Sequence, residues 1–288
     1  MERIQAAIQK AKEQRSGAVR AEEPPRGPAA YRQSIPPAPL RGPEAAMAPL
    51  ADSWGELPAF EPDPGRMRRE RIVSFARTDP IHLTFDMLRT KILRQMRENG
   101  WTSLSITSPT TACGKTVVAL NLAFSFAQQK DRRTVLMDLD LRRPAVGRAL
   151  GLQEVAPQSL ERFLQGEADS LGAAFVRCGE GLAIAPAATS ARNPAELLSH
   201  PAARAELERM KATLKPEAIL YDLPPMLICD DVLAFLPNVD CVLIVAGAEI
   251  STLDEIDRCE RELSEQTNVL GVVLNKCRYV PDQYGYGY

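Results

Sequence analysis

Residues 103–127 contain the pattern that most restricts how this chain can fold. A strand-like run at 103–108 leads into the segment Pro109-Thr-Thr-Ala-Cys-Gly-Lys-Thr116, and an apolar, helix-like stretch follows up to residue 127. A strand, a short loop ending in Gly-Lys-Thr and a helix form the layout of a phosphate-binding loop. In such a loop, backbone N–H groups and the positive end of the helix attract phosphate oxygens.

The loop residues have separate expected roles. Lys115 is expected to reach the β- and γ-phosphate oxygens, and the Thr116 hydroxyl is expected to hold Mg²⁺, so the predicted cofactors are ATP and Mg²⁺. Pro109 departs from the common motif, which has glycine at this position. The residues expected around the nucleotide are Thr110, Thr111, Ala112, Cys113, Gly114, Lys115, Thr116 and Val117.

The composition changes along the chain and predicts four segments. Residues 1–16 are rich in helix formers, and 1–20 are predicted to form a helix, which is either a docking element or an ordinary solvated helix. Eleven of the 23 prolines lie between Pro24 and Pro64, so residues 21–69 are predicted to be a disordered, Pro- and Ala-rich linker. The folded domain is predicted at 70–277, and a flexible tyrosine-rich tail at 278–288.

Charge and cysteine usage argue against several function classes. The formal net charge is −2 without a long run of one sign, which argues against nucleic acid as the main partner. No segment approaches the ~18 apolar residues of a membrane span, and the N-terminus lacks the apolar core of a signal peptide. The six cysteines are scattered without a CxxC pair, as expected for reduced thiols in a cytoplasmic protein.

Short apolar runs alternate with amphipathic stretches after residue 127. The runs at 134–138, 182–185, 218–222, 241–246 and 270–274 have the near-continuous apolar character of parallel strands covered on both faces. Amphipathic helices are expected between them, among others at 195–214 and 251–266. This alternation predicts one α/β domain with a doubly wound, mostly parallel sheet, in which ligands bind at the carboxyl ends of the strands.

Aspartates follow two of these predicted strands. Asp138 and Asp140 lie two residues apart, so on an extended segment both carboxylates point to one side, toward a metal ion and an incoming hydroxyl group. Asp222 ends the run 218–222 and stands where a Walker B aspartate holds Mg²⁺. We expect all three carboxylates to meet Lys115 at one edge of the sheet.

These motifs resemble those of the bacterial tyrosine kinases that control capsule and exopolysaccharide synthesis. The loop and the segments 135–142 and 220–225 are similar to the family's Walker A, A′ and B motifs, and 192–198 is similar to a further family segment. The resemblance covers roughly residues 80–288 and implies a P-loop NTPase of the deviant Walker, MinD-like type. It also implies a protein-tyrosine autokinase, with Arg142 and Asn275 near the nucleotide.

With this resemblance, the catalytic roles can be assigned as hypotheses. Lys115 is expected to stabilise charge on the transferred phosphoryl group. Asp138 is our choice for the group that accepts the proton of the attacking tyrosine hydroxyl, while Asp140 and Asp222 join Thr116 as metal ligands. The order of the three aspartates stays open at this stage.

The C-terminal residues include four of the chain's six tyrosines. Tyr279, Tyr284, Tyr286 and Tyr288 lie within the last ten residues, and single glycines separate the last three. Such a tail is too flexible for a core, so its phenol groups can enter the active site of another subunit. The resemblance implies that these tyrosines are autophosphorylated in trans, and an aromatic tail that packs on the domain or on a partner is the alternative.

The resemblance implies partners as well. A separate integral-membrane polysaccharide chain-length regulator is expected to act as adaptor and to recruit the chain to the inner face of the membrane, and a cognate tyrosine phosphatase is a candidate partner. The family's oligomerisation helix usually carries Glu, Arg and Arg, whereas the matching positions here are Leu83, Asp86 and Arg89. We therefore expect a homo-oligomer without predicting the family's ring.

Two other functions share this fold. A switch ATPase of the partition or division-site type usually has a second lysine early in the loop, where this chain has Thr110, and it lacks a terminal tyrosine cluster. A nucleotide-binding scaffold with weak catalysis would instead regulate a membrane polysaccharide export complex through the N-terminal helix and linker. Both stay open because fold alone is a weak guide to function.

Overall fold

The computed structural model describes residues 52–129, 132–152 and 160–278, which belong to one compact unit. The predicted N-terminal helix at 1–20, residues 21–51 of the predicted linker and the tyrosines Tyr279, Tyr284, Tyr286 and Tyr288 lie outside these residues. Within the described part of the chain, no helix is both long enough and apolar enough to cross a membrane.

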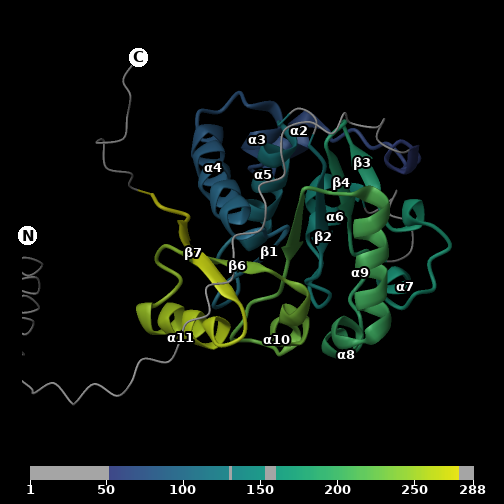
Figure 1. The fold of residues 1–288 in the computed structure, drawn as a ribbon. Coiled ribbons are helices and arrows are strands. Elements are labelled where there is room, and N and C mark those ends of the chain that lie inside the picture. Colours follow the sequence, from purple (N-terminus) through teal and green to yellow (C-terminus); the bar gives the residue numbers. More distant parts are fainter. Residues whose placement is uncertain (1–51, 130–131, 153–159, 279–288) are drawn as a thin grey trace, which may run out of the picture. The chain divides into compact units, whose positions relative to one another are not determined.

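A seven-stranded sheet forms the centre of the described domain, with strand order β3-β4-β2-β5-β1-β6-β7 (Figure 1). Its neighbouring strands are parallel, except that β3 runs antiparallel to β4. All six predicted strands are present, so the mostly parallel α/β fold is confirmed, and β3 is an additional strand that we did not predict. The strands are β1 (Ser103–Thr107), β2 (Thr134–Asp138), β3 (Val176–Cys178), β4 (Leu182–Ala185), β5 (Ala218–Asp222), β6 (Cys241–Gly247) and β7 (Asn268–Asn275).

Helices cover both faces of the sheet, as a doubly wound fold requires (Figure 1). The helices α4 and α5 share a hydrophobic core with Leu104 and Leu243, and α9 and α11 share a second core with Ile219 and Ile244. The helices are α2 (Pro64–Arg69), α3 (Val73–Ala76), α4 (His82–Asn99), α5 (Lys115–Ala127), α6 (Val146–Leu150), α7 (Leu160–Leu164), α8 (Pro194–Ser199), α9 (Pro201–Leu214), α10 (Asp231–Phe235) and α11 (Leu253–Ser264), with short 3₁₀ turns at Asp52–Trp54, Leu171–Ala173 and Leu236–Asn238.

The stretch predicted as one helix at 195–214 is divided into α8 and α9. Pro201 is the first residue of α9, and His200 before it has an extended backbone with ψ of 139°. A proline lacks the N–H group that would continue the preceding helix and disfavours a helical conformation in the residue before it. The new helix begins with an N–H bond from Ala202 to the His200 ring.

Residues 52–69 are part of the folded domain, so the prediction that the disordered linker reaches residue 69 is wrong for this segment. Trp54 and Met67 are 4% and 1% exposed, and the Trp54 ring nitrogen donates to the Glu180 carbonyl at 2.9 Å. The prolines serve local structure here, because Pro64 begins α2 after the capping residue Asp63. A few well-spaced apolar residues anchor the segment despite its proline-rich composition.

The strand order brings the predicted functional segments to one edge of the sheet. β5 lies between β1 and β2, so the carboxyl ends of these three strands are neighbours. Asp138 at the end of β2 is paired in register with Asp222 at the end of β5. The chain leaving β2 stays attached there, because the Leu139 N–H donates to the Asp222 carbonyl at 2.9 Å.

Candidate active site

The loop between β1 and α5 is held in shape by its own polar groups and by β7. The Ser108 hydroxyl donates to the Thr110 carbonyl at 2.7 Å, and the Asn275 amide donates to the Cys113 carbonyl at 2.9 Å. Gly114, directly before α5, has a φ of 87°, a conformation that glycine adopts without a steric penalty. Asn275 therefore lies where it supports the predicted nucleotide loop from the end of the last strand.

A cavity of about 370 Å³ opens over this loop. Of the residues predicted around the nucleotide, Thr111, Ala112, Cys113, Gly114, Lys115, Thr116, Val117 and Arg142 line it, whereas Thr110 and Asn275 do not. Residues that we did not predict complete the walls, namely Ser108, Arg143, Ala145, Arg148, Pro224, Pro225, Ile228 and Cys229. The cavity thus has a basic side and an apolar side above a loop of backbone amides.

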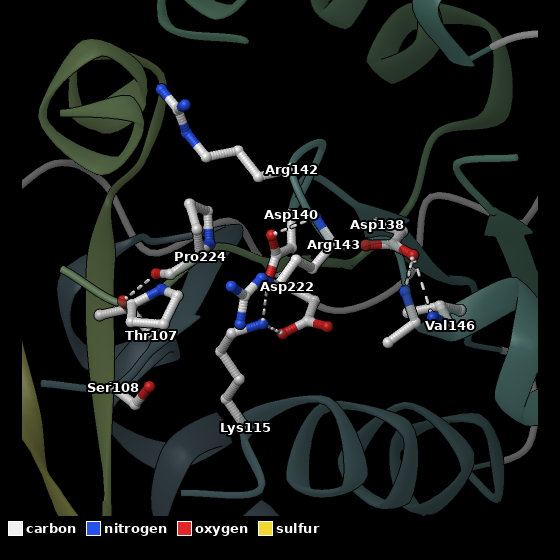
Figure 2. A network of polar contacts seen from close by, with 12 residues as sticks. Thr107, Ser108, Lys115, Asp138, Asp140, Arg142, Arg143, Val146, Asp222 and Pro224 are labelled. Atoms are coloured by element: carbon white, nitrogen blue, oxygen red, sulfur yellow. Dashed lines mark hydrogen bonds and ion pairs between the residues drawn. The ribbon is translucent and has the colours of Figure 1, made fainter. Parts of the chain in front are cut away.

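Lys115 lies among carboxylates at the floor of the cavity (Figure 2). Its Nζ is 2.7 Å from Asp140 Oδ2 and 3.5 Å from Asp222 Oδ1, and its side chain is 11% exposed. Burial alone disfavours the charged amine, but the carboxylates of Asp222 and Asp140 outweigh it and raise the pKa of Lys115. A permanent positive charge is therefore held where phosphate oxygens are expected.

Asp222 has the properties of a ligand for Mg²⁺. Both of its carboxylate oxygens are buried without a hydrogen-bond partner of good geometry, and burial raises its pKa against the opposing effects of Lys115 and the Thr116 hydroxyl. The described residues hold no cluster of three or more His, Cys, Asp or Glu side chains suited to a metal ion. Mg²⁺ usually takes one or two carboxylates and completes its coordination with phosphate oxygens and water, so Asp222 with Thr116 fits a nucleotide-bound ion.

Asp138 has a different environment from Asp140, although we predicted that both point to one side. Its Oδ2 accepts the N–H groups of Ala145 and Val146 at 3.0 and 2.9 Å, and Figure 2 shows it turned toward Val146. The strand ends at Asp138, so the alternation of an extended segment does not continue to Asp140, which bonds the Arg143 N–H in the following turn. Burial and the charge of Asp222 raise the pKa of Asp138 to about 8.

The Arg142 guanidinium group points away from Lys115 in Figure 2, while the residue lines the cavity in which we predicted the nucleotide. Its Nε lies 2.8 Å from Asp231 Oδ2 and its Nη2 lies 2.8 Å from Asp231 Oδ1. No local pattern in the sequence indicates this partner, because Asp231 is distant in the chain and begins the short helix α10. The position of Arg143 at the cavity could have been predicted, because this residue follows Arg142 directly. The position of Arg148 could not, because this residue lies in α6.

Comparison with known proteins agrees with this geometry. The nucleotide-binding domain shared by CobQ, CobB, MinD and ParA matches residues 104–282, which is more than half of the chain. The kinase domain of the Escherichia coli tyrosine kinase ETK has a similar structure, with a TM-score of 0.63 and 29% identity over 75% of this chain and 85% of that one. The tyrosine-protein kinase CpsD of Streptococcus pneumoniae is 30% identical over 189 residues, covering 64% of this chain and 81% of CpsD. The chain belongs to the bacterial tyrosine kinase family.

The extent of the match differs between relatives. EpsB of Ralstonia nicotianae is 29% identical over 211 residues, which is 73% of this chain but 27% of EpsB. The chain thus spans about a quarter of the length of EpsB and most of the length of CpsD.

Substitution of Gly114 by alanine tests the shape of the loop. A Cβ atom at Gly114 would lie 2.3 Å from the Asn275 amide nitrogen, so the Asn275 side chain must move away from the Cys113 carbonyl, and the φ of 87° adds strain. We expect Mg-ADP to bind at least about tenfold more weakly, as measured by isothermal titration calorimetry. Gly100→Ala is the matched control, because Gly100 has a φ of 70° and nothing within 4 Å. Equal affinities for the two variants would contradict the role of the contact between Gly114 and Asn275.

Proposed function

We propose that this chain is an ATP-dependent protein-tyrosine autokinase. It transfers phosphate to the tyrosines of its own C-terminal tail in trans and thereby regulates exopolysaccharide or capsule polymerisation and export. The observation that carries the proposal is Lys115, buried between Asp140 and Asp222 at the floor of a cavity formed by a phosphate-binding loop. Membership of the tyrosine kinase family supports this choice over other reactions of the same fold.

The loop and Lys115 bind and orient the nucleotide in this proposal. Backbone amides of the loop point at the phosphates, and the Lys115 ammonium moves from Asp140 to the β- and γ-phosphate oxygens when ATP enters. Thr116, Asp140 and Asp222 are the groups that would hold Mg²⁺, which neutralises charge on the transferred group when it is bound. The main contribution of the protein is thus fixed charge in a site whose ionic groups are already in place.

Asp138 is the proposed proton acceptor. The phenol oxygen of a tyrosine attacks the γ-phosphorus, the bond to ADP breaks, and the phenol proton passes to the Asp138 carboxylate. A tyrosine hydroxyl has an ordinary pKa of about 10, and a carboxylate whose pKa is raised to about 8 is a much better acceptor than an ordinary one.

The apolar side of the cavity suits the ring of the acceptor. Pro224, Pro225 and Ile228 line it, and Ile228 is 59% exposed although large aliphatic side chains usually avoid water. A tyrosine ring placed there would cover apolar surface with its hydroxyl group toward the phosphates.

One labelling experiment tests the function and its trans character. We expect wild-type chain with Mg-ATP to carry phosphate on Tyr279, Tyr284, Tyr286 or Tyr288, and a variant with all four changed to Phe to carry none there, by mass spectrometry. A mixture of this Phe variant with Lys115→Met, whose tail is intact, should label only the Lys115→Met chain. ATP turnover without phosphotyrosine would contradict the kinase and support a nucleotide-dependent switch or scaffold.

We further propose a homo-oligomer and a membrane adaptor, an integral-membrane chain-length regulator that brings the chain to the inner face of the membrane, with a phosphatase that reverses the modification. The resemblance to the kinase family supports these partners. Asp86 at the family's oligomerisation helix is engaged internally with Arg77, Arg89 and Ser125, while Leu83 is 54% exposed beside it. An oligomer through α4 would therefore use apolar contacts more than charged ones.

A further inference from the structure

An ion pair between Arg142 and Asp231 connects the turn that follows β2 to the segment that follows β5. Arg142 and Asp231 form two parallel hydrogen bonds of 2.8 Å each, the forked geometry in which a guanidinium group binds a carboxylate most specifically. The Asp231 side chain is fully buried, and that of Arg142 is 45% exposed. The fork makes the contact directional, and the burial of the acid makes it costly to break.

Each partner is attached to a different part of the candidate active site. Arg142 lies in the turn after β2, two residues beyond Asp140, which contacts Lys115 at 2.7 Å. Asp231 begins α10, and this helix is anchored by the buried Val232 and Phe235. The Phe235 ring packs edge-on against Tyr221 at 4.9 Å between centroids, directly before Asp222 in β5. The pair thus fixes the turn after β2 to the anchored helix α10.

We propose that Asp231 is a positioning residue, which holds Arg142 and thereby keeps the turn that carries Asp140 in register with Lys115 and Asp222. The inference rests on the proposed function, and it assigns the guanidinium group of Arg142, which lines the cavity, to Asp231 instead of to the nucleotide. Arg142 acts on the reaction through the turn, and its guanidinium group stays on Asp231 during the cycle. A displacement of about 1 Å in such a site can cost about 100-fold in rate.

A double-mutant cycle separates this role from direct nucleotide binding. We expect Arg142→Gln and Asp231→Asn each to lower kcat about tenfold, and the double variant to lower it by about the same factor, because all three lack one shared interaction. The Kd for ADP without Mg²⁺ should stay within about twofold of wild type. Any change in Mg-ADP affinity should be the same in both single variants, because both act through the turn that carries Asp140. Arg142→Lys, which keeps the charge but loses the fork, should recover part of kcat.

Several controls accompany the cycle. Arg258 and Glu262 on α11 form a contact of the same 2.8 Å with more exposed side chains, so Arg258→Gln should change neither kcat nor binding. Thermal melting identifies variants that do not fold, and hydrogen exchange of the Leu139 and Arg143 amides reports the order of the turn without turnover. Both amides are bonded at the site, to the Asp222 and Asp140 carbonyls, so every variant in the cycle should exchange them faster.

Three results would overturn the inference. The first is a loss of about 100-fold in kcat for the double variant, which is the product of the two single losses. The second is weaker Mg-ADP binding in Arg142→Gln but not in Asp231→Asn. The third is unchanged hydrogen exchange of the Leu139 and Arg143 amides in Asp231→Asn. The double-mutant cycle tests the role of Asp231 separately from the kinase activity, because its kcat is measured by ATP turnover as well as by phosphotyrosine formation. A chain that hydrolyses ATP without labelling tyrosine would refute the kinase and still decide the role of Asp231.

Discussion

Lys115→Met is expected to lower kcat for phosphotyrosine formation by about 1000-fold. The ammonium group is the one cation that the described structure places at the floor of the cavity within 4 Å of both Asp140 and Asp222. Methionine keeps the length and the apolar stem of the side chain, so the loss comes from charge and not from a void. Quantitative mass spectrometry of the tail, with purified enzyme at saturating Mg-ATP, measures the effect.

The same substitution should also destabilise the nucleotide-free protein. Asp140 and Asp222 lose their cation while they remain buried, and removing one partner of a buried pair costs about 3 kcal/mol or more. Urea unfolding at pH 8 should show this loss, and at pH 5 it should be smaller because burial raises the pKa of Asp222, which takes up a proton more readily as the pH falls. Lys211→Met is the control, since Lys211 makes a contact of 2.8 Å with the exposed Glu208 on α9. Full kinase activity in Lys115→Met would rule out the proposed chemistry.

The central sheet was predictable because parallel strands buried on both faces have nearly continuous apolar sequences. The run from Ala218 to Asp222 is an example, since all five residues are buried in β5. β3 was missed because it has only three residues, Val176–Cys178, with the polar Arg177 in the middle. A strand of this length has too few residues for a periodic signal.

The N-terminal part of the domain shows why average composition misleads. Proline content between 52 and 69 suggested disorder, but the fold depends on single contacts of Trp54, Leu57 and Met67, which are nearly fully buried. The partners of Trp54 include the Glu180 carbonyl and the Arg133 guanidinium group, which lies 4.9 Å from the ring centroid. Tertiary contacts with residues so far along the chain leave no local pattern in the sequence.

The candidate site was predictable where strand topology alone places the residues. Lys115, Asp140 and Asp222 meet because β2, β5 and β1 are neighbours and their carboxyl ends lie at one edge. The partners of Asp138 and Arg142 depend on the path of the turn after β2 and on the starting point of α10. These are single backbone and side-chain contacts between distant segments, which spacing in one sequence does not encode.

Asp138→Asn is expected to lower kcat by at least about 100-fold, because the amide cannot accept the phenol proton. The wild-type kcat should rise as the pH increases toward about 8, the value to which the pKa of Asp138 is raised, since the carboxylate must be ionised to act as the acceptor. The residual kcat of Asp138→Asn should not rise with pH in this range. Phosphotyrosine formation between pH 6 and pH 9 measures both profiles.

Stability should change in the opposite sense from activity. The folded chain keeps a proton on Asp138 up to about pH 8, whereas the unfolded chain releases it near pH 4. Because the native state binds more protons between these values, its stability falls as the pH rises through this window, and the Asn variant escapes that loss. We expect the stability of Asp138→Asn relative to wild type to increase by at least about 1 kcal/mol from pH 5 to pH 8.5, in urea titrations.

Asp240 provides a control of opposite sign. It is partly buried, but the N–H groups of Thr102 and Ser103, each 2.8 Å from its Oδ2, lower its pKa below the ordinary value. The ionised Asp240 therefore stabilises the fold above about pH 4, and this stabilisation is lost as the pH falls through the lowered pKa. Asp240→Asn should be less stable than wild type at neutral pH, and its kcat should depend on pH as the wild-type kcat does. A parallel response of Asp138→Asn and Asp240→Asn to pH would show that Asp138 is an ordinary structural acid, and the proton acceptor would then have to be sought at Asp140 or Asp222.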